Sequence, residues 1–546
     1  MIPPEKPTSR RAARAARDGA TRDGATNGGQ PEGGEATQRL EVPATEAFFL
    51  PPAPPTSAPT HTSEFVPEPE RPAPSGFLAG LFVRHPRAWI ATALSVVFVL
   101  LGTGSVFAGS LMAPEAPAEP NTAAPLVATS ASPTPTADPA RPVPAHPAAA
   151  TALRTCSVAA LAADPRLRTF EGVVVNTATG DVLFDRSASK PAPTASVLKV
   201  LTAAAALAIL GPDARLTTRV FKGTEPGSIV LVGGGDPTLN AGSPTLYAGA
   251  PSLADLAAQT KAAWEKDSDE PITKVILDAT MWDPADNWNA SWGERALADG
   301  DQTRVNALMV DAGRSDPSRG SSRRSATPVA DAGAAFAKAL GLPAGVDIVP
   351  GTGKAGEPIA QVQSQPVKTL IGQMLIDSDN TLGEMLARVT SVSSGAGGTS
   401  ASLATVIPKA LAAYGIPTTG VVIKDGSGLS ADNAVPPAYL AALMTKVLAG
   451  KQNLGIIYSA LPVAGKTGTL KTRFSGDSAA ARGLVNAKTG WIGSSRTLAG
   501  IAHSPDGSAL SFAFFALGSN VAANAMTALD NLTAGVLKCG NNLSNN

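Results

Sequence analysis

Pro193-Thr194-Ala195-Ser196-Val197-Leu198-Lys199 stands where a loop enters an apolar helix, and this stretch decides how the chain is interpreted. Ser196 and Lys199 are three residues apart, so in a helix they share one face, one turn apart. An unprotonated lysine there can take the hydroxyl proton and make the serine oxygen a nucleophile without a histidine. Thr194 is a candidate N-cap, and the all-round apolar run 200–210 predicts a buried helix. The alternative is an ordinary helix-capping serine, because the S-x-x-K spacing alone is common.

A second candidate is Ser378-Asp379-Asn380, which stands between helical patterns at 367–376 and 381–389. A short turn between two helices can direct a hydroxyl and an amide into a cleft. The competing interpretation is a plain helix cap and turn, since Ser, Asp and Asn are the residues favoured there.

The tripeptide Lys-Thr-Gly occurs twice, at 466–468 and 488–490. Lys488 lies in a strand pattern, where Lys488 and Thr489 can line one edge of a cleft and Gly490 can let a ligand backbone approach closely. Lys466 follows a loop-like run and is expected to face solvent. A phosphate-binding loop is excluded at the first copy, because position 460 is Ala where that motif needs Gly.

The globular part begins near residue 151 and has strand patterns at both of its ends. A hairpin is predicted over 171–186, where two β-like runs flank a Thr-Ala-Thr-Gly turn. Further strands are predicted over 484–492, 497–502 and 509–516, followed by a helix over 521–537. Together these elements predict one layered α+β domain, with the mixed segment between them as an insertion.

The segment before the globular part predicts a membrane anchor. Residues 1–87 are rich in Pro, Gly, Ala, Thr and Arg and predict a disordered cytoplasmic tail. Residues 88–112 carry no charge and are long enough to cross a bilayer, and residues 113–150 predict a Pro/Ala-rich linker. Basic residues precede the apolar run, so we expect a single-pass cell-membrane protein with its catalytic domain outside the cytoplasm. A signal peptide cleaved near 106–108 is the alternative.

Composition excludes several classes of function. Outside the cytoplasm, Cys156 and Cys539 predict one disulfide that joins the two ends of the domain, with two unpaired thiols as the alternative. Of four histidines only His503 lies in the globular part, so an H-x-x-x-H zinc site cannot be built and a Ser-His-Asp triad is disfavoured. The formal net charge is zero, which gives no indication of a nucleic-acid partner. No cofactor or metal is expected.

S-x-x-K, S-x-N and K-T-G in this order across one domain resemble the penicillin-binding proteins and serine β-lactamases. More narrowly, the chain is similar to the D-alanyl-D-alanine carboxypeptidase/endopeptidase family, that is, peptidase family S13, the class C low-molecular-mass penicillin-binding proteins. The resemblance spans roughly 165–520 and also rests on GGGDPTL at 233–239, DGSGLS at 425–430 and LPVAG-x-x-GTL at 461–470. In that family the catalytic K-T-G follows GTL by some twenty residues, which selects Lys488 over Lys466.

The resemblance implies an antiparallel sheet with flanking helices that carries an inserted subdomain. We expect the penicillin-binding domain at 151–222 and 360–546 and the insertion at 223–359. Ala431 stands where the family commonly has Arg, and the insertion looks short, which puts recognition of the substrate side chain in question.

The implied activity is that of a serine D-alanyl-D-alanine carboxypeptidase that trims or cleaves peptidoglycan stem peptides and is acylated by β-lactams. The implied catalytic residues are Ser196, Lys199, Ser378 and Asn380, and the implied substrate-binding residues are Lys488, Thr489, Gly490 and Trp491. A transpeptidase or a β-lactamase would use the same motifs, and a catalytically silent wall-binding scaffold is the alternative from another class.

Overall fold

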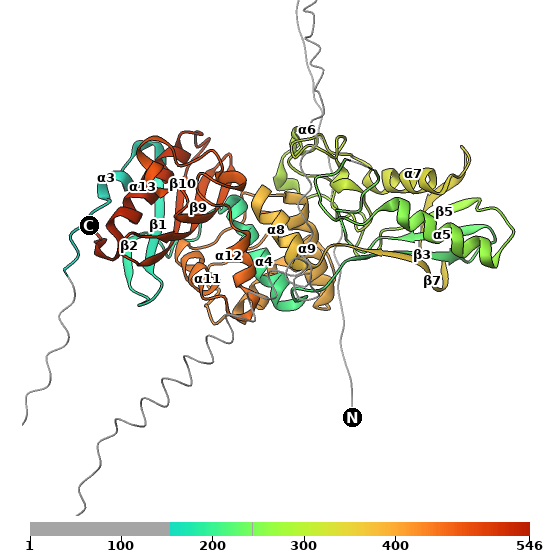
Figure 1. The fold of residues 1–546 in the computed structure, drawn as a ribbon, viewed down its shortest axis with the longest axis horizontal. Helices are drawn as coiled ribbons and strands as arrows, with labels where there is room; N and C mark the ends of the chain where they lie inside the picture. Colours follow the sequence, from blue (N-terminus) through green and yellow to red (C-terminus); the bar gives the residue numbers. More distant parts are fainter. Residues whose placement is uncertain (1–152, 243) are drawn as a thin grey trace, which may run out of the picture. The chain divides into compact units, whose positions relative to one another are not determined.

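The structure, a computed structural model, describes residues 153–242 and 244–546 and contains two five-stranded sheets (Figure 1). The first has the strand order β2-β1-β10-β9-β8, and the second has the order β6-β5-β4-β3-β7. The strands of the first sheet are β1 (Thr169–Asn176), β2 (Val182–Arg186), β8 (Val485–Ile492), β9 (Ser495–His503) and β10 (Ala509–Leu517). Those of the second are β3 (Thr217–Gly223), β4 (Ser228–Val232), β5 (Lys274–Asp278), β6 (Asp347–Pro350) and β7 (Lys354–Gln363).

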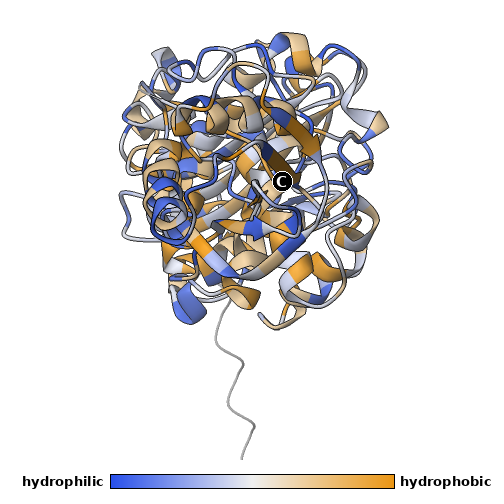
Figure 2. Cartoon of the chain, turned by 90° about the vertical axis from the view of Figure 1, so that its right-hand side faces the viewer, coloured by the Kyte–Doolittle hydropathy of each residue, from blue (hydrophilic) through white to orange (hydrophobic). Residues whose placement is uncertain are grey.

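Helices pack against both sheets. The principal ones are α4 (Lys199–Ile209), α5 (Leu253–Asp267), α7 (Pro328–Leu340), α8 (Val367–Asp377), α9 (Asn380–Ser393), α10 (Ser400–Ala412), α11 (Pro437–Ala449) and α13 (Ala525–Cys539). Shorter helices are α3 (Ala159–Ala162), α6 (Ala296–Asp299) and α12 (Gly455–Ala460). Individual helices in Figure 2 alternate between hydrophobic and hydrophilic residues, as helices with one buried face do.

The first sheet is buried on both faces. Along β10, Phe512 and Phe514 join the hydrophobic cluster that contains the buried residues of α13. Ala513 and Phe515 point the other way, into the cluster formed by α4, α8, α9 and α11. Successive side chains of a strand point to opposite faces, so one apolar strand serves two hydrophobic cores. The sheet therefore separates an outer layer that contains α13 and α3 from an inner group of helices that includes α4, which follows Ser196.

The predicted strands and the predicted disulfide are confirmed. β1 and β2 form an antiparallel hairpin, and β1 also pairs antiparallel with β10, from Thr169 opposite Leu517 to Asn176 opposite Leu510. The early and late strands thus share one sheet. Cys156 and Cys539 are 383 positions apart in the sequence and form a disulfide that joins the two ends of the domain.

The second sheet is the insertion, and its bounds differ from the expected 223–359. β3 starts at Thr217 and pairs with both β4 and β7, and β7 continues to Gln363. The expected boundaries therefore fall inside these two strands. β3, by which the chain leaves the main domain, pairs with β7, by which it returns. The sequence pattern of a single strand does not reveal which sheet the strand joins.

The predicted tail, the predicted span at 88–112 and the predicted linker lie outside the described residues. Among the residues that the structure describes, every helix is too short or too polar to traverse a bilayer.

Candidate active site

Ser196 lies in a tight helical turn that leads into α4. The turn is a 3-10 helix, η2 (Ala195–Leu198), and Lys199 begins the α-helix. The predicted side-chain cap at Thr194 is absent; the Thr194 hydroxyl donates instead to the carbonyl of Ala195. The turn is anchored by the Thr194 carbonyl, which accepts a hydrogen bond from Thr497 Oγ1 at 2.6 Å. Ala195 has φ +47°, a left-handed conformation unusual for alanine, which is typical of backbone held in place at functional sites.

The first two motifs meet at one ammonium group. Lys199 Nζ lies 2.9 Å from Ser196 Oγ, 2.6 Å from Asn380 Oδ1 and 2.6 Å from the carbonyl of Ser427. The Lys199 side chain is fully buried, and this burial lowers its pKa to about 8, against the opposing charges of Asp425, Asp379 and Glu384. A lysine with this pKa can act as a base near neutral pH.

The loop Asp425–Ser430 lies beneath Lys199, a role that the sequence motifs do not predict. Glu384 Oε1 on α9 accepts hydrogen bonds from the backbone N–H groups of Gly426 and Ser427, at 2.9 and 2.8 Å. These bonds fix the Ser427 carbonyl that accepts from Lys199. The DGSGLS stretch is visible in the sequence as a family motif. Its contact with Glu384 is not, because the two are 42 residues apart and only the fold brings them together.

The third motif comes from β8, an edge strand of the first sheet. Lys488 Nζ donates to Ser378 Oγ at 2.8 Å and to the carbonyl of Thr489 at 2.9 Å. Burial and the nearby charge of Lys199 lower the pKa of Lys488 well below its usual value. Thr489 Oγ1 lies 2.9 Å from Thr469 Oγ1. Lys466 is exposed, as predicted, so only the second Lys-Thr-Gly joins the site.

The predicted role of Gly490 is corrected by its surroundings. A Cβ at this position would collide with Thr497 Oγ1, the Thr194 carbonyl and Ala195 Cβ. The close approach that requires glycine is therefore the one between β8 and the turn that carries Ser196, and not an approach by a ligand backbone.

An open cleft of about 730 Å³ leads to these groups. It is lined by Ser196, Ser291, Trp292, Asp301, Asn380, Leu429, Ala431, Trp491, Ile492, Gly493, Ser494, Ser519 and Asn520. Trp491 is 63% exposed and its ring stacks with the guanidinium of Arg496 at 4.7 Å. Lys199 and Lys488 are buried behind this surface. The cleft thus presents Ser196 and Asn380 to a ligand, with both lysines beneath them.

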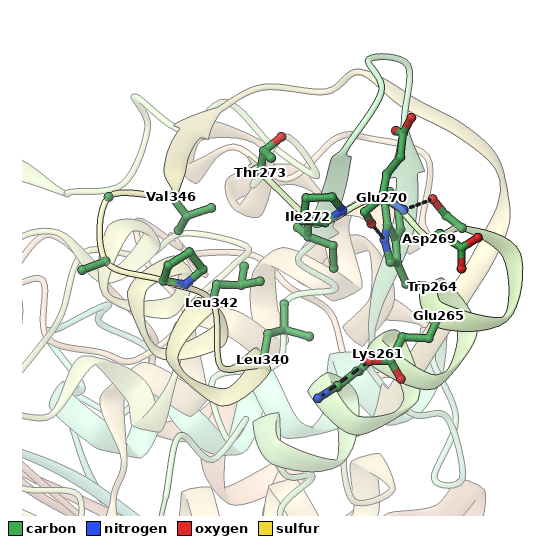
Figure 3. A pocket seen from close by; sticks show the side chains of 15 residues that line it. Lys261, Trp264, Glu265, Asp269, Glu270, Ile272, Thr273, Leu340, Leu342 and Val346 are labelled. Carbon is green, nitrogen blue, oxygen red and sulfur yellow. Dashed lines mark hydrogen bonds and ion pairs between the residues drawn. The ribbon is translucent and has the colours of Figure 1, made fainter.

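A separate cavity of about 690 Å³ lies in the inserted subdomain, between the C-terminal parts of α5 and α7. Figure 3 shows Trp264, Ile272, Leu340 and Leu342 around it, with Glu270 on the rim. None of the predicted site residues lines it, so it plays no part in the site described above. His503 also lies outside the site: it ends β9, and its Nε2 lies 2.8 Å from Tyr458 Oη.

The profile of the D-Ala-D-Ala carboxypeptidase 3 (S13) family matches residues 154–321 and 315–536. Carboxypeptidase DacB of Mycolicibacterium smegmatis is 35% identical over 416 residues, which cover 73% of this chain and 86% of that protein. Carboxypeptidase Rv3627c of Mycobacterium tuberculosis is 35% identical over 71% of this chain and 84% of its own length.

Among solved structures, penicillin binding protein 4 (dacB) from Haemophilus influenzae superposes with a TM-score of 0.57 at 18% identity, over 67% of this chain and 95% of that one, and this likeness bears on the fold alone. The matched segments of the family profile include all three motifs that converge on Lys199 and Lys488. The chain therefore belongs to the D-Ala-D-Ala carboxypeptidase 3 (S13) family.

Proposed function

We propose that this protein is a serine D-alanyl-D-alanine carboxypeptidase that acts on peptidoglycan stem peptides through an acyl-enzyme on Ser196. The observation that carries the proposal is the position of one buried lysine, Lys199, within hydrogen-bonding distance of both Ser196 and Asn380. A structural serine at a helix start has no need of a lysine with a lowered pKa beside it. Membership of the S13 family supports the same reaction.

The geometry supports a role for each group. Neutral Lys199 takes the Ser196 proton across 2.9 Å, and Ser196 Oγ attacks the carbonyl carbon between the two terminal D-alanines. Ser378, which accepts a hydrogen bond from Lys488, relays the proton that Lys199 has taken from Ser196 to the leaving amine. Lys488 and Thr489 bind the terminal carboxylate, and water then releases the acyl group.

Two further contacts complete the mechanism. Asn380 Nδ2 donates one hydrogen bond to the Asp301 carbonyl at 2.8 Å, which leaves its second N–H for the substrate amide. The backbone N–H groups of Ser196 and Trp491 form the oxyanion hole, where one donor is worth about 3 kcal/mol of barrier. β-Lactams acylate the same serine.

Acylation is expected to accelerate with rising pH. A pKa of about 8 leaves about a tenth of Lys199 in the neutral, basic form at pH 7, and this fraction grows as the pH rises through the pKa. Because the charge of Lys199 lowers the pKa of Lys488, the titrations of the two lysines are coupled and the profile reports the pair. The acylation rate constant for a fluorescent penicillin should rise about fiftyfold between about pH 6 and 8 and level off about one pH unit above the pKa of Lys199. A rate that stays flat or falls over this range, in protein shown to be folded by thermal melting, would contradict Lys199 as the base.

The reaction itself is tested by mass spectrometry of the products that the purified protein forms from peptidoglycan fragments. Release of free D-alanine from pentapeptide stems is the expected result. Products joined to an added amine would indicate a transpeptidase, and fast turnover of penicillin with no peptide cleavage would indicate a β-lactamase. Binding of fragments without any product would indicate the catalytically silent scaffold.

We also propose that the catalytic domain lies outside the cytoplasm and is tethered to the cell membrane by residues 88–112. The uncharged run, the basic residues before it and a peptidoglycan substrate support this placement. The Cys156–Cys539 disulfide supports it as well, because such bonds persist in oxidising compartments.

A further inference from the structure

The middle residue of Ser378-Asp379-Asn380 is held by the inserted subdomain. Asp379 Oδ2 accepts hydrogen bonds from Tyr247 Oη and from Arg314 Nη2, each at 2.7 Å. Arg314 Nη1 also donates to Tyr247 Oη at 2.7 Å, which closes a ring of three side chains. The Arg314 and Asp379 side chains are only 3% and 6% exposed. The two partners lie 65 and 132 residues before Asp379 in the sequence.

Asp379 connects this ring to the catalytic groups on either side of it. Its other oxygen, Oδ1, accepts from the N–H of Leu382 and so caps α9, which begins at Asn380. Ser378 precedes it with φ +60°, a left-handed conformation that costs energy in a serine. Displacement of the Asp379 carboxylate would therefore shift both the Ser378 hydroxyl and the Asn380 amide.

Arg314 is itself held by a buried, strained turn. Asp311, Ala312 and Gly313 all have positive φ, at +50°, +52° and +66°. The GGGDPTL stretch locks this turn: the N–H of Asp311 donates to the Leu239 carbonyl at 2.8 Å, and the N–H of Ala312 donates to the Pro237 carbonyl at 2.7 Å.

The glycines of the same stretch permit close packing. A Cβ at Gly234 would collide with the backbone of Thr217, and one at Gly235 would meet Val389 of α9. GGGDPTL thus packs against α9 and supports the turn that carries Arg314, a role that its residues alone did not disclose.

The positive charge of Arg314 and the negative charge of Asp379 compensate each other, although both side chains are buried. Burial opposes ionisation of Asp379, but the guanidinium groups of Arg314 and Arg324 hold its pKa below the usual range. Asp301, Asp311 and Asp377 are further carboxylates near the ring, and burial is the first cause that raises the pKa of each. Loss of Arg314 would leave Asp379 as a poorly compensated buried charge, which is strongly destabilising in general.

We infer that Arg314 and Tyr247 are positioning residues: through Asp379 they hold Ser378 against Lys488 and Asn380 against Lys199. This inference rests on the proposed function, since it concerns the geometry of the same site. The inserted subdomain is then part of the catalytic apparatus, although neither residue touches Ser196 or either lysine.

The test compares two buried ion pairs. Arg314→Met removes the partner of Asp379, and Arg473→Met removes the partner of Asp530, a similar pair at 2.6 Å that joins the segment after Leu470 to α13. Both variants of the full chain should melt at lower temperature than the wild type. Only Arg314→Met should also slow acylation by a fluorescent penicillin, measured where all proteins are folded, by about 100-fold, as expected for misplaced catalytic groups.

A milder variant keeps the test decisive if Arg314→Met does not fold. Tyr247→Phe leaves the ion pair intact and removes one hydrogen bond to Asp379. It should lower kcat for a D-Ala-D-Ala peptide several-fold with little change in KM, because Lys488 and Thr489 still bind the terminal carboxylate. Arg314→Lys keeps a positive charge beside Asp379 but lacks the second N–H group that reaches Tyr247. Compared with Arg314→Met, it should regain more of the melting temperature than of the acylation rate.

The outcomes separate the two claims. A wild-type protein that is never labelled by penicillin would contradict the proposed function. A wild type that is labelled, together with Arg314 and Tyr247 variants that react as fast as Arg473→Met, would overturn the positioning role alone.

Discussion

Replacing Ser196 with alanine is expected to abolish covalent labelling by a fluorescent penicillin and to reduce D-alanine release by about a millionfold, the usual scale for loss of a catalytic nucleophile. In the proposed mechanism the oxygen of Ser196 forms the acyl bond, and alanine has no side-chain oxygen. Gel fluorescence and product analysis by mass spectrometry measure the two effects.

The fold should tolerate this change. Ser196→Ala removes one hydrogen bond to Lys199, worth about 1 kcal/mol, so the melting temperature should fall only slightly. Ser508→Ala, in an exposed turn between β9 and β10, is the matched control and should label like the wild type. Labelling that persists in Ser196→Ala would refute the assignment of the nucleophile.

Lys488→Met should reduce acylation and carboxypeptidase activity by about a hundredfold or more, the scale of removing a buried charge from its hydrogen-bonded partners. The change removes the Lys488 Nζ that donates to Ser378, the group proposed to bind the terminal carboxylate. Steady-state kinetics on a D-Ala-D-Ala peptide and penicillin acylation rates provide the measurements.

The chain carries its own control for this experiment. Lys466→Met alters the same tripeptide at an exposed position and should leave both rates unchanged. Equal losses in the two variants would mean that the effect does not come from the cleft. A loss confined to Lys466→Met would reverse the assignment of the two copies.

Strands with a clear local pattern could be predicted from the sequence. The hairpin around residues 177–180, the three late strands and the terminal helix each occupy the expected stretch, because alternating or continuous apolar runs define them locally. Burial of the helix after Ser196 could be predicted for the same reason. The bounds of the insertion could not, since β3 and β7 resemble strands of either sheet.

The catalytic motifs could be located because each is short and the family resemblance orders them. The residues that hold these motifs in place through hydrogen bonds could not be located in this way. Glu384 reaches the Asp425–Ser430 loop across 42 residues, and Tyr247 reaches Asp379 across 132. Such contacts leave no periodic signal in the chain; only the fold brings their partners together. The role of Gly490 could not be predicted for the same reason, because its neighbours are Thr497 and the turn at Thr194 and Ala195.

The pairing of β1 with β10 governs when activity can arise. A nascent chain leaves the ribosome with Ser196 and Lys199 already made, but β8, which carries Lys488, and β10, which completes the sheet beside β1, are synthesised almost last. Contacts between such distant segments form slowly, because a long loop must close before they stabilise anything. A truncated or half-translated polypeptide therefore holds the nucleophile without the strand that faces it, and cannot hydrolyse a stem peptide.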